Sequence, residues 1–294
     1  MKRFVFKLLP IAGMLITWGS AYAVTCTIGV TSPPGIVFDP NTPLQRMGNV
    51  SVSCTPTVSR ETTRNNVPII YIGIGQGNRT PRSMLQTGTN KVTYEINKSA
   101  GAGSWNEAAG TTVATTAGGL NFTMAQGTVG TSQPYDFPFF LNIPAQPTTP
   151  VGTYTDTLIT ATIRDTNNAG AILATTTFTL SATISPGCSF STAPPTLNIN
   201  YTSFAAAAAS GTSVFALNCK AGTTITNVTV TPVTGTTDRN VGYSMAVGPT
   251  TGTGTGTPQN FTVTGTAAAG QAGCTSPCAT ATPLNNSHTI TVSY

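Results

Sequence analysis

The sequence places its six cysteines in three pairs along the chain: Cys26 with Cys54, Cys188 with Cys219, and Cys274 with Cys278. The members of the first two pairs stand 28 and 31 residues apart, and those of the third stand 4 apart. An even number of cysteines in an exported protein is typical of disulfide bonds. The near-equal first two intervals favour sequential pairing, with one long loop closed by a disulfide in each of two domains.

Metal binding is the alternative chemistry for these residues, through Cys274, Cys278 and His288. His288 is the only histidine, no fourth ligand is evident, and an oxidising compartment favours disulfides. The sequence also lacks a base and nucleophile set, a Gly-x-Ser-x-Gly motif and a paired-acid motif. We therefore expect no enzyme activity, no metal and no cofactor, and we interpret His288 as a strand residue.

Residues 1–23 have the layout of a secretory signal peptide. A basic start precedes an apolar run over residues 8–18, and the small-residue motif Ala-Tyr-Ala ends at Ala23. This run is shorter than the about 18 apolar residues that a membrane-spanning helix needs, and no later segment reaches that length. We expect export and a mature chain that begins at Val24 and does not cross a membrane.

The mature chain carries few charges. Removal of residues 1–23 takes away three of the 13 basic residues, which leaves 10 against 8 acidic residues, or a net charge of +2. Charged residues make up 7% of the whole chain, far below the roughly 25% of ordinary soluble domains. Because Lys and Arg do not cluster, we expect no nucleic-acid partner.

Runs of Val, Ile and Thr punctuated by Gly, Pro and Asn predict an all-β protein with the strand spacing of immunoglobulin-like β-sandwiches. The first half has predicted strands at residues 25–30, 50–54, 68–74, 91–96, 120–124, 137–143 and 154–163. The second half has them at 215–219, 228–233, 242–247, 261–264 and 289–294, with 205–209 as a short turn or irregular loop. The length suits two sandwich domains in tandem, residues 24–184 and 185–294.

The longest alternating stretch, Ile172 to Ile184, lies between the two halves. Its even positions are nearly all apolar and face one side of a strand: Ile172, Ala174, Thr176, Phe178, Leu180, Ala182 and Ile184. A turn over residues 165–170 would let it form a hairpin with the preceding strand and complete the first domain in cis. The alternative is that it begins the second domain and runs into Cys188.

The first half resembles the Spore Coat Protein U domain family over nearly all of residues 24–165. The matching features are Phe38, Pro40, the segment Gly-Asn-Val-Ser-Val-Ser-Cys at 48–54, Arg-Ser-Met-Leu at 82–85, Val-Thr-Tyr-Glu-Ile at 92–96 and Trp105. The best match is Ile-Pro-Ala-Gln at 143–146, followed by Pro-Val-Gly-Thr-Tyr-Thr-Asp-Thr-Leu at 150–158. It is similar to the closing turn and last strand of the family.

The second half resembles the same family more weakly. Residues 261–265 and Ala-Ala-Gly-Gln at 268–271 are similar to the same turn, and residues 287–292 stand where the last strand would be. His288 occupies the position of the aspartate, and the tyrosine of the corner is absent. The pair Cys274 and Cys278 is additional to the family pattern.

The family comprises subunits of archaic (CsuA/B-like) chaperone–usher pili of Gram-negative bacteria, so the resemblance implies a sandwich that lacks its final strand. A periplasmic pilus chaperone would lend a strand during folding, and an outer-membrane usher would assemble the fibre. The N-terminal donor strand of the adjacent subunit would then replace the chaperone's strand. In the second domain we expect the receiving edge at Ile290, Val292 and Tyr294.

Two residues, Val24 and Thr25, separate the predicted cleavage site from Cys26, and they span about 7 Å, too little to fill a groove. We expect a tip subunit that receives a donor strand without supplying one. Its first domain would be an adhesin head at the cell surface, for attachment to a host or abiotic surface and for biofilm formation. The alternative is a secreted coat or matrix protein that forms no fibre.

No sequence feature identifies a ligand of the first domain. The loops at residues 55–67 and 165–170 are expected at the pole away from the second domain, where contact with a surface would occur. Trp105 and the segment 135–137 could also contact a ligand, although packing in the core is the favoured interpretation.

Overall fold

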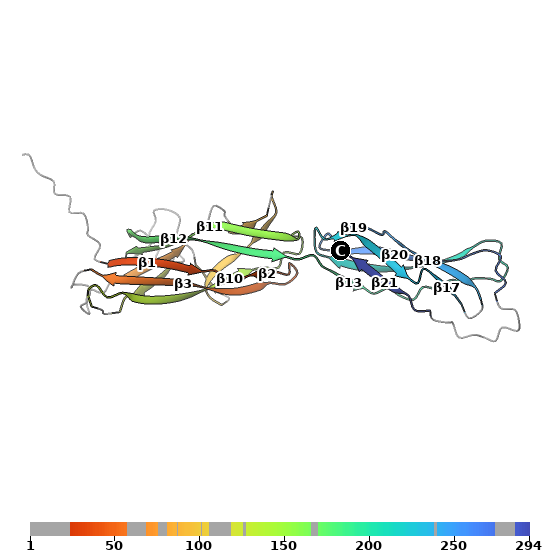
Figure 1. The fold of residues 1–294 in the computed structure, drawn as a ribbon, viewed down its shortest axis with the longest axis horizontal. Coiled ribbons are helices and arrows are strands. Elements are labelled where there is room, and N and C mark those ends of the chain that lie inside the picture. The colour runs from red at the N-terminus through yellow and green to blue at the C-terminus, as the bar shows by residue number, and fades with distance from the viewer. Residues whose placement is uncertain are drawn as a thin grey trace, which may run out of the picture.

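The computed structural model describes residues 24–57, 69–75, 81–86, 88–100, 102–105, 119–125, 128–165, 170–237, 240–273 and 286–294. All regular structure in these ranges is β, so the predicted all-β class is confirmed. Two sandwiches lie end to end, and the chain passes from the first to the second after β12 (Figure 1). No helix in the described ranges is long and apolar enough to span a membrane.

The first sandwich consists of two sheets. One sheet has the order β1 (Val24–Thr31), β3 (Leu44–Pro56), β10 (Gln133–Ile143), β7 (Glu95–Ser99) and β8 (Ala102–Ser104). The other has the order β2 (Ile36–Val37), β12 (Ile172–Ile184), β11 (Gly152–Asp165), β4 (Ile69–Ile74) and β9 (Leu120–Thr123). Two short strands extend it, β5 (Ser83–Leu85) beside β11 and β6 (Lys91–Thr93) beside β5.

The aromatic residues that the sequence left open as ligand contacts pack in or against the core of the first sandwich. Trp105 is fully buried and its indole N–H donates to the carbonyl of Ile72 at 2.9 Å. Tyr135 and Phe137 are half-buried against the ring of Phe122, with ring centroids 4.7 and 4.9 Å away. Trp105 thus lies in the core and Tyr135 and Phe137 pack against it, and only Asp136 of the segment 135–137 is exposed.

The second sandwich repeats the plan with fewer paired strands. Its larger sheet has the order β13 (Cys188–Thr192), β14 (Ala209–Cys219), β20 (Pro258–Ala267), β18 (Gly242–Gly248) and β17 (Thr234–Thr236). Opposite it, β16 (Asn227–Thr231) pairs with β21 (Thr289–Ser293), and β15 (Thr224–Ile225) pairs with β19 (Gly252–Thr253). Its core is separate and smaller, with Phe215, Leu217, Val228, Phe261 and Val263 at its centre.

A disulfide joins two neighbouring strands of the larger sheet in the second sandwich and of the corresponding sheet in the first. Cys26 and Cys54 face each other across β1 and β3 and are bonded, as are Cys188 and Cys219 across β13 and β14. The structure thus contains both long-interval pairings predicted from the sequence. Cys274 and Cys278, the third predicted pair, lie outside the described residues, as does the predicted signal peptide.

Strand β12 belongs to the sheet of the first sandwich. It pairs antiparallel with β11 along almost its whole length, from Gly152 opposite Ile184 to Arg164 opposite Ile172. Four of its inward side chains lie in the first core: Phe178, Leu180, Ala182 and Ile184. Ile172 is 55% exposed, contrary to its expected burial, because it lies past a register shift at Ile163 and Arg164, beyond the edge of the core.

Replacement of Leu180 by Ala tests how strongly β12 supports the first sandwich. Leu180 is 1% exposed, so the cavity should destabilise the first domain by about 2–5 kcal/mol. Thr177→Ala, on the exposed face of the same strand, should change stability by less than about 0.5 kcal/mol. The measurement is urea unfolding of protein that starts at Val24, followed by the fluorescence of Trp105, its only tryptophan. An unfolding curve for Leu180→Ala that matches the unsubstituted protein would contradict the expectation.

Candidate functional site

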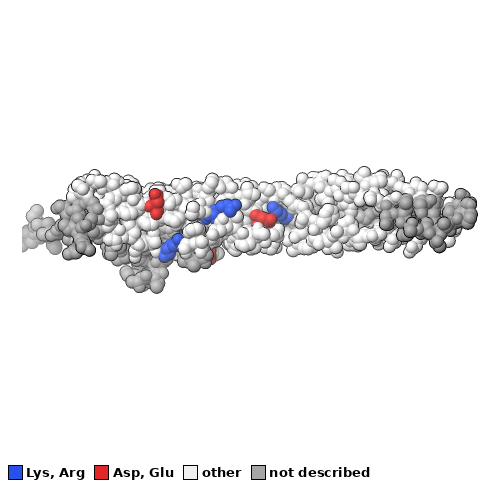
Figure 2. All heavy atoms as spheres, turned by 90° about the horizontal axis from the view of Figure 1, so that it is seen from below, with Lys and Arg blue, Asp and Glu red and all other residues white. Residues whose placement is uncertain are grey.

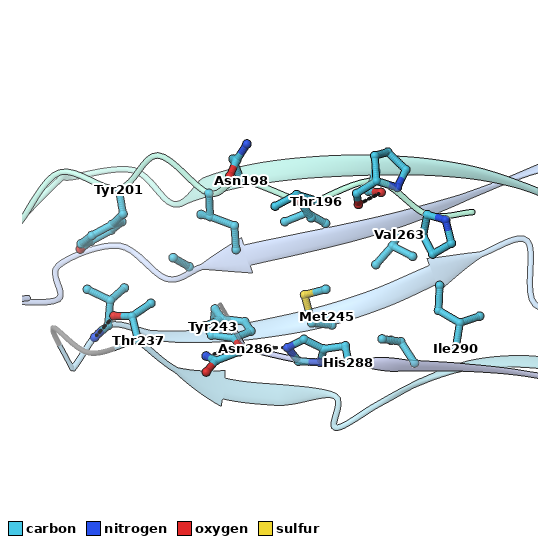
Figure 3. A pocket seen from close by; sticks show the side chains of 18 residues that line it. Thr196, Asn198, Tyr201, Thr237, Tyr243, Met245, Val263, Asn286, His288 and Ile290 are labelled. Carbon is cyan, nitrogen blue, oxygen red and sulfur yellow. Dashed lines mark hydrogen bonds between the residues drawn. The ribbon is translucent and has the colours of Figure 1, made fainter. Parts of the chain in front are cut away.

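The second sandwich contains an open groove with a volume of about 490 Å³ (Figure 3). One wall is the segment 194–201, the floor is formed by β18 and β20, and the other wall includes Asn286, His288 and Ile290. The middle of the groove is apolar and is lined by Leu197, Ile199, Met245, Val263 and Ile290. Met245, Val263 and Ile290 are seen along its length in Figure 3.

The wall at residues 194–201 forms no strand, for reasons of its sequence. It begins with Pro194 and Pro195, which have no N–H to donate to a neighbouring strand. It is held to the larger sheet by the hydroxyl of Ser213, which donates to the carbonyl of Pro195 at 2.8 Å. Gly265 lets the wall lie close to the floor, because a Cβ there would meet Ile199 at 2.8 Å and Leu197 at 2.9 Å.

The opposite wall is the edge of a strand. β21 pairs with β16 from Thr289 opposite Thr231 to Ser293 opposite Asn227, and no other strand of the described ranges pairs with it. Ile290 and Val292 point inward but are only half-buried, whereas their neighbours in the strand are exposed. An edge of this kind can pair with another strand.

Only part of the predicted receiving edge lines the groove. Ile290 lines it, but Val292 packs against the core beyond the lining. Tyr294 follows the last residue of β21, lies outside the lining, and is 57% exposed, and the receiving edge expected at these three residues stays a prediction. The residues that sequence analysis missed are those of the other wall and of the floor.

One end of the groove is polar and hydrogen-bonded. The Asn286 side-chain amide donates to the hydroxyl of Tyr243 at 2.7 Å, and this hydroxyl lies 2.9 Å from Nε2 of His288. Nδ1 of His288 lies 2.8 Å from the carbonyl of Pro232. Because a carbonyl can only accept, Nδ1 carries a proton, and in neutral imidazole Nε2 accepts from Tyr243. His288 precedes β21, so its predicted place within the strand is wrong by one residue.

The same position in the first sandwich is filled by β12. There, β12 lies between β11, with which it is antiparallel, and β2, with which Ala182 and Thr183 pair in parallel. The backbone N–H of Phe38 also donates to the carbonyl of Thr183 at 2.9 Å. In the second sandwich β21 stands for β11 and the segment 194–201 stands for β2, with the groove between them.

In each sandwich the side chain of one glutamine bonds both backbone groups of another residue, and this shared glutamine clasp indicates that the two sandwiches are copies of one plan. The side chain of Gln146 accepts from the N–H of Thr93 at 2.9 Å and donates to its carbonyl at 3.1 Å. The side chain of Gln271 accepts from the N–H of Gly242 at 2.7 Å and donates to its carbonyl at 2.9 Å. Each clasp therefore holds the residue just before a tyrosine, which is Tyr94 in one domain and Tyr243 in the other.

The partner of that tyrosine differs between the domains. Tyr94 donates to a carboxylate oxygen of the buried Asp156 at 2.8 Å, whereas Tyr243 contacts His288. Nearby, buried Arg82 donates to three backbone carbonyls, and burial lowers its pKa while Tyr94 and Asp156 oppose that shift. The histidine that stands in the position of the aspartate thus replaces a buried tyrosine–carboxylate hydrogen bond by a network of Tyr243, His288 and Asn286 at the end of the groove.

The tyrosine corner, by contrast, occurs in the first domain alone within the part of the chain that the structure describes. Tyr154 donates to the carbonyl of Pro150 at 2.6 Å, four residues earlier, and burial raises the pKa of its hydroxyl. In the second domain a different tyrosine, Tyr201, ties the groove wall to the turn: its hydroxyl accepts from the N–H of Gln271 at 2.7 Å. This tyrosine comes from the other end of the domain's sequence, so no local motif reveals its role.

The groove has no charged lining residue, and charges are rare on the molecule as a whole. On the face in Figure 2, the coloured side chains lie over the first domain and near the junction. Among the described residues no three His, Cys, Asp or Glu side chains are placed to hold a metal ion. The arrangement offers an apolar cleft beside a strand edge, which is suited to binding an extended peptide segment.

The fold and the groove define a protein of two immunoglobulin-like sandwiches, the second of which has an open strand position within its described residues. The family model of the Spore Coat Protein U domain matches residues 14–162, about half of the chain. The chain belongs to this family. No curated protein matches it in sequence.

Two solved structures resemble the chain at low identity. One is a chaperone–tip adhesion subunit pre-assembly complex, CsuC–CsuE, from the archaic chaperone–usher Csu pili of Acinetobacter baumannii. It has 14% identity and a TM-score of 0.43 over 92% of this chain and 100% of that one. The other is a protein of unknown function from Porphyromonas gingivalis, with 8% identity and a TM-score of 0.24 over 82% and 83%. Likeness at these values carries no information on function.

Matched tyrosine substitutions test the difference between the two networks. Tyr94→Phe removes a buried hydrogen bond to a carboxylate and should destabilise the first domain by about 1.5–3 kcal/mol. Tyr243→Phe removes bonds to neutral groups and should destabilise the second domain by about 0.5–1.5 kcal/mol. Trp105 fluorescence during urea unfolding reports on the first domain, and hydrogen exchange of the β18 amides reports on the second. A larger loss for Tyr243→Phe would contradict this account.

Proposed function

We propose that this protein is the tip subunit of a chaperone–usher pilus, joined to the fibre through the groove of its second domain. A periplasmic chaperone fills the groove first, and the N-terminal strand of the adjacent subunit replaces it at the outer-membrane usher. The first domain points outward at the cell surface and attaches the bacterium to a host or abiotic surface, which supports biofilm formation.

One observation carries the proposal: the same sandwich occurs twice, and the position that holds β12 in the first copy is an open groove in the second. In the first copy β12 pairs with β11 through backbone hydrogen bonds, and it also buries four side chains in the core. The second copy has the corresponding strand edge at β21 and an apolar cleft beside it. A strand added by another protein would pair with this edge and cover the apolar cleft.

The direction of the fibre follows from the same comparison. The first domain holds its own final strand, so it needs no donor there. Within the described residues the second domain has the open strand position, so the fibre would attach at this domain. The first domain then lies on the far side of the junction from the fibre, which is where an adhesin head would contact a surface.

A strand supplied in cis should close the groove. The chain is lengthened after Tyr294 by a copy of residues 166–184, so that β21 is followed by the same turn and strand that follow β11. We expect protection of the β21 amides from hydrogen exchange and stabilisation by about 1.5–3 kcal/mol per large apolar side chain buried. Retention of a co-produced periplasmic chaperone should fall.

The matched control carries the same extension with Ser at the four positions that copy Phe178, Leu180, Ala182 and Ile184. It can form backbone hydrogen bonds but cannot fill the cleft. Equal protection and equal chaperone retention for the two extensions would contradict the proposal. A stable monomer obtained without any chaperone would favour a secreted coat or matrix protein instead.

The adhesive role is tested separately, at the outward pole of the first domain. β12 runs from that pole toward the second domain, so its hairpin with β11 lies at the far end (Figure 1). Replacement of residues 166–169, and of 58–67, by Gly/Ser segments of equal length should abolish attachment to surfaces. Both segments lie outside the described residues. Fibres of normal length in electron micrographs serve as the control, and full attachment by both variants would refute the adhesive assignment.

A further inference from the structure

At the junction between the two domains, a strand that completes one domain is joined covalently to the domain that follows it, as a donor strand is joined to its own subunit. β12 fills the first domain, and after residues 185–187 the same chain continues as the body of the second domain. That body contacts the pole of the first domain that lies beside the end of β12. The N–H of Val151 donates to the carbonyl of Ala221 at 2.8 Å, and Gly256 lies against the carbonyl of Pro147.

The second domain has the equivalent pole at the polar end of its groove. In the first domain, the contact loop follows directly after Gln146, whose N–H donates to the carbonyl of Pro40 at 2.7 Å. In the second domain the equivalent glutamine, Gln271, accepts through its carbonyl from the N–H of Phe204 at 2.8 Å. The pole formed by residues 201–205 and 268–273 therefore stands where residues 38–42 and 144–151 stand in the first domain.

Phe204 is unusual in both backbone and exposure. Its φ is 59°, in the left-handed region that a bulky residue rarely adopts, and its side chain is 72% exposed. It is followed by Ala206, Ala207 and Ala208, which are also exposed. The fold holds this strained aromatic residue outward through the bond to Gln271, and strain maintained in this way is typical of functional contacts.

The direction in which a strand would run through the groove determines the pole at which the rest of the donor subunit lies. β12 runs antiparallel to β11 and ends, at Ile184, opposite Gly152 beside the junction. A strand antiparallel to β21 would end at the pole of Tyr201 and Thr237, since β21 begins near that end and runs away from it (Figure 3). The domain that follows such a strand would lie against Phe204.

We propose that the loop 204–208 is a docking surface for the globular body of the subunit whose strand fills the groove. This proposal rests on the proposed function. The occupant is a domain of the same family, seated as the second domain is seated on the first. Phe204 is the apolar anchor of that contact, and the strand itself does not touch it.

The test compares two probes on the full chain, unsubstituted or with Phe204→Gly. One probe is a peptide of residues 172–184. The other is the same strand with a body, residues 172–294, whose own groove is closed by the strand extension described above and whose folding is checked by circular dichroism. Binding is measured by fluorescence anisotropy of the labelled probes.

We expect Phe204→Gly to leave the peptide's Kd within about twofold and to raise that of the body-carrying probe about tenfold. The midpoint of thermal unfolding should not fall, because glycine adopts φ 59° without strain. Val214→Ser, which removes a side chain that is 45% exposed on β14 away from the pole, is the matched control and should change neither Kd.

Each remaining outcome overturns a different statement. If the peptide binds and Phe204→Gly leaves the Kd of the body-carrying probe unchanged, the docking surface is refuted while the proposed function stands. If the peptide does not bind the unsubstituted chain, the proposed function is refuted and the docking surface with it. An equal loss of affinity for both probes would show that Phe204 acts through the groove, which also refutes the docking surface.

Discussion

The final strand of the sandwich is the constraint on which the whole molecule depends. An immunoglobulin-like sheet that ends at β11 or β21 has an edge of unpaired backbone groups and an apolar face to cover. The first domain solves this with β12, whose three large buried side chains, Phe178, Leu180 and Ile184, contribute about 1.5–3 kcal/mol each. Their sum is comparable to the whole stability of a typical domain, about 5–15 kcal/mol. A domain without such a strand is therefore one that needs a partner.

The glutamine clasp explains how two domains of the same plan can keep their poles rigid around an open or closed groove. Gln146 and Gln271 each bond both backbone groups of one residue, so the closing turn is fixed to the sheet without help from the last strand. The groove wall at 194–201 is likewise fixed, through Ser213 and Tyr201. The empty strand position is thus bordered by supports that do not require its occupant.

Strict alternation made most of the fold predictable, because a strand with one buried face leaves a clear period in the sequence. It identified β12, and the near-equal cysteine intervals of 28 and 31 residues identified both disulfides that the structure describes. The wall at 194–201 is interpreted from the sequence as a turn because it begins with Pro194 and Pro195, although Leu197, Ile199 and Tyr201 alternate with polar residues in the strand period. Tyr243 and Phe204 escaped because their roles depend on partners 45 and 67 residues away, His288 and Gln271. Exposure at Ile172 depends on a register shift, which composition does not encode.

The interactions that hold this molecule together are mostly between uncharged groups, so salt screens them little. Charged residues make up 7% of the chain, and the groove walls are held by amide, hydroxyl and backbone hydrogen bonds. Exposed ion pairs weaken as the Debye length shrinks with ionic strength, whereas apolar burial and main-chain hydrogen bonds are not weakened by this screening. An extracellular fibre meets wide changes in ionic strength. If the proposed strand addition joins this protein to a fibre, that junction consists of strand pairing and apolar contact, and its binding free energy contains little charge–charge attraction for salt to screen.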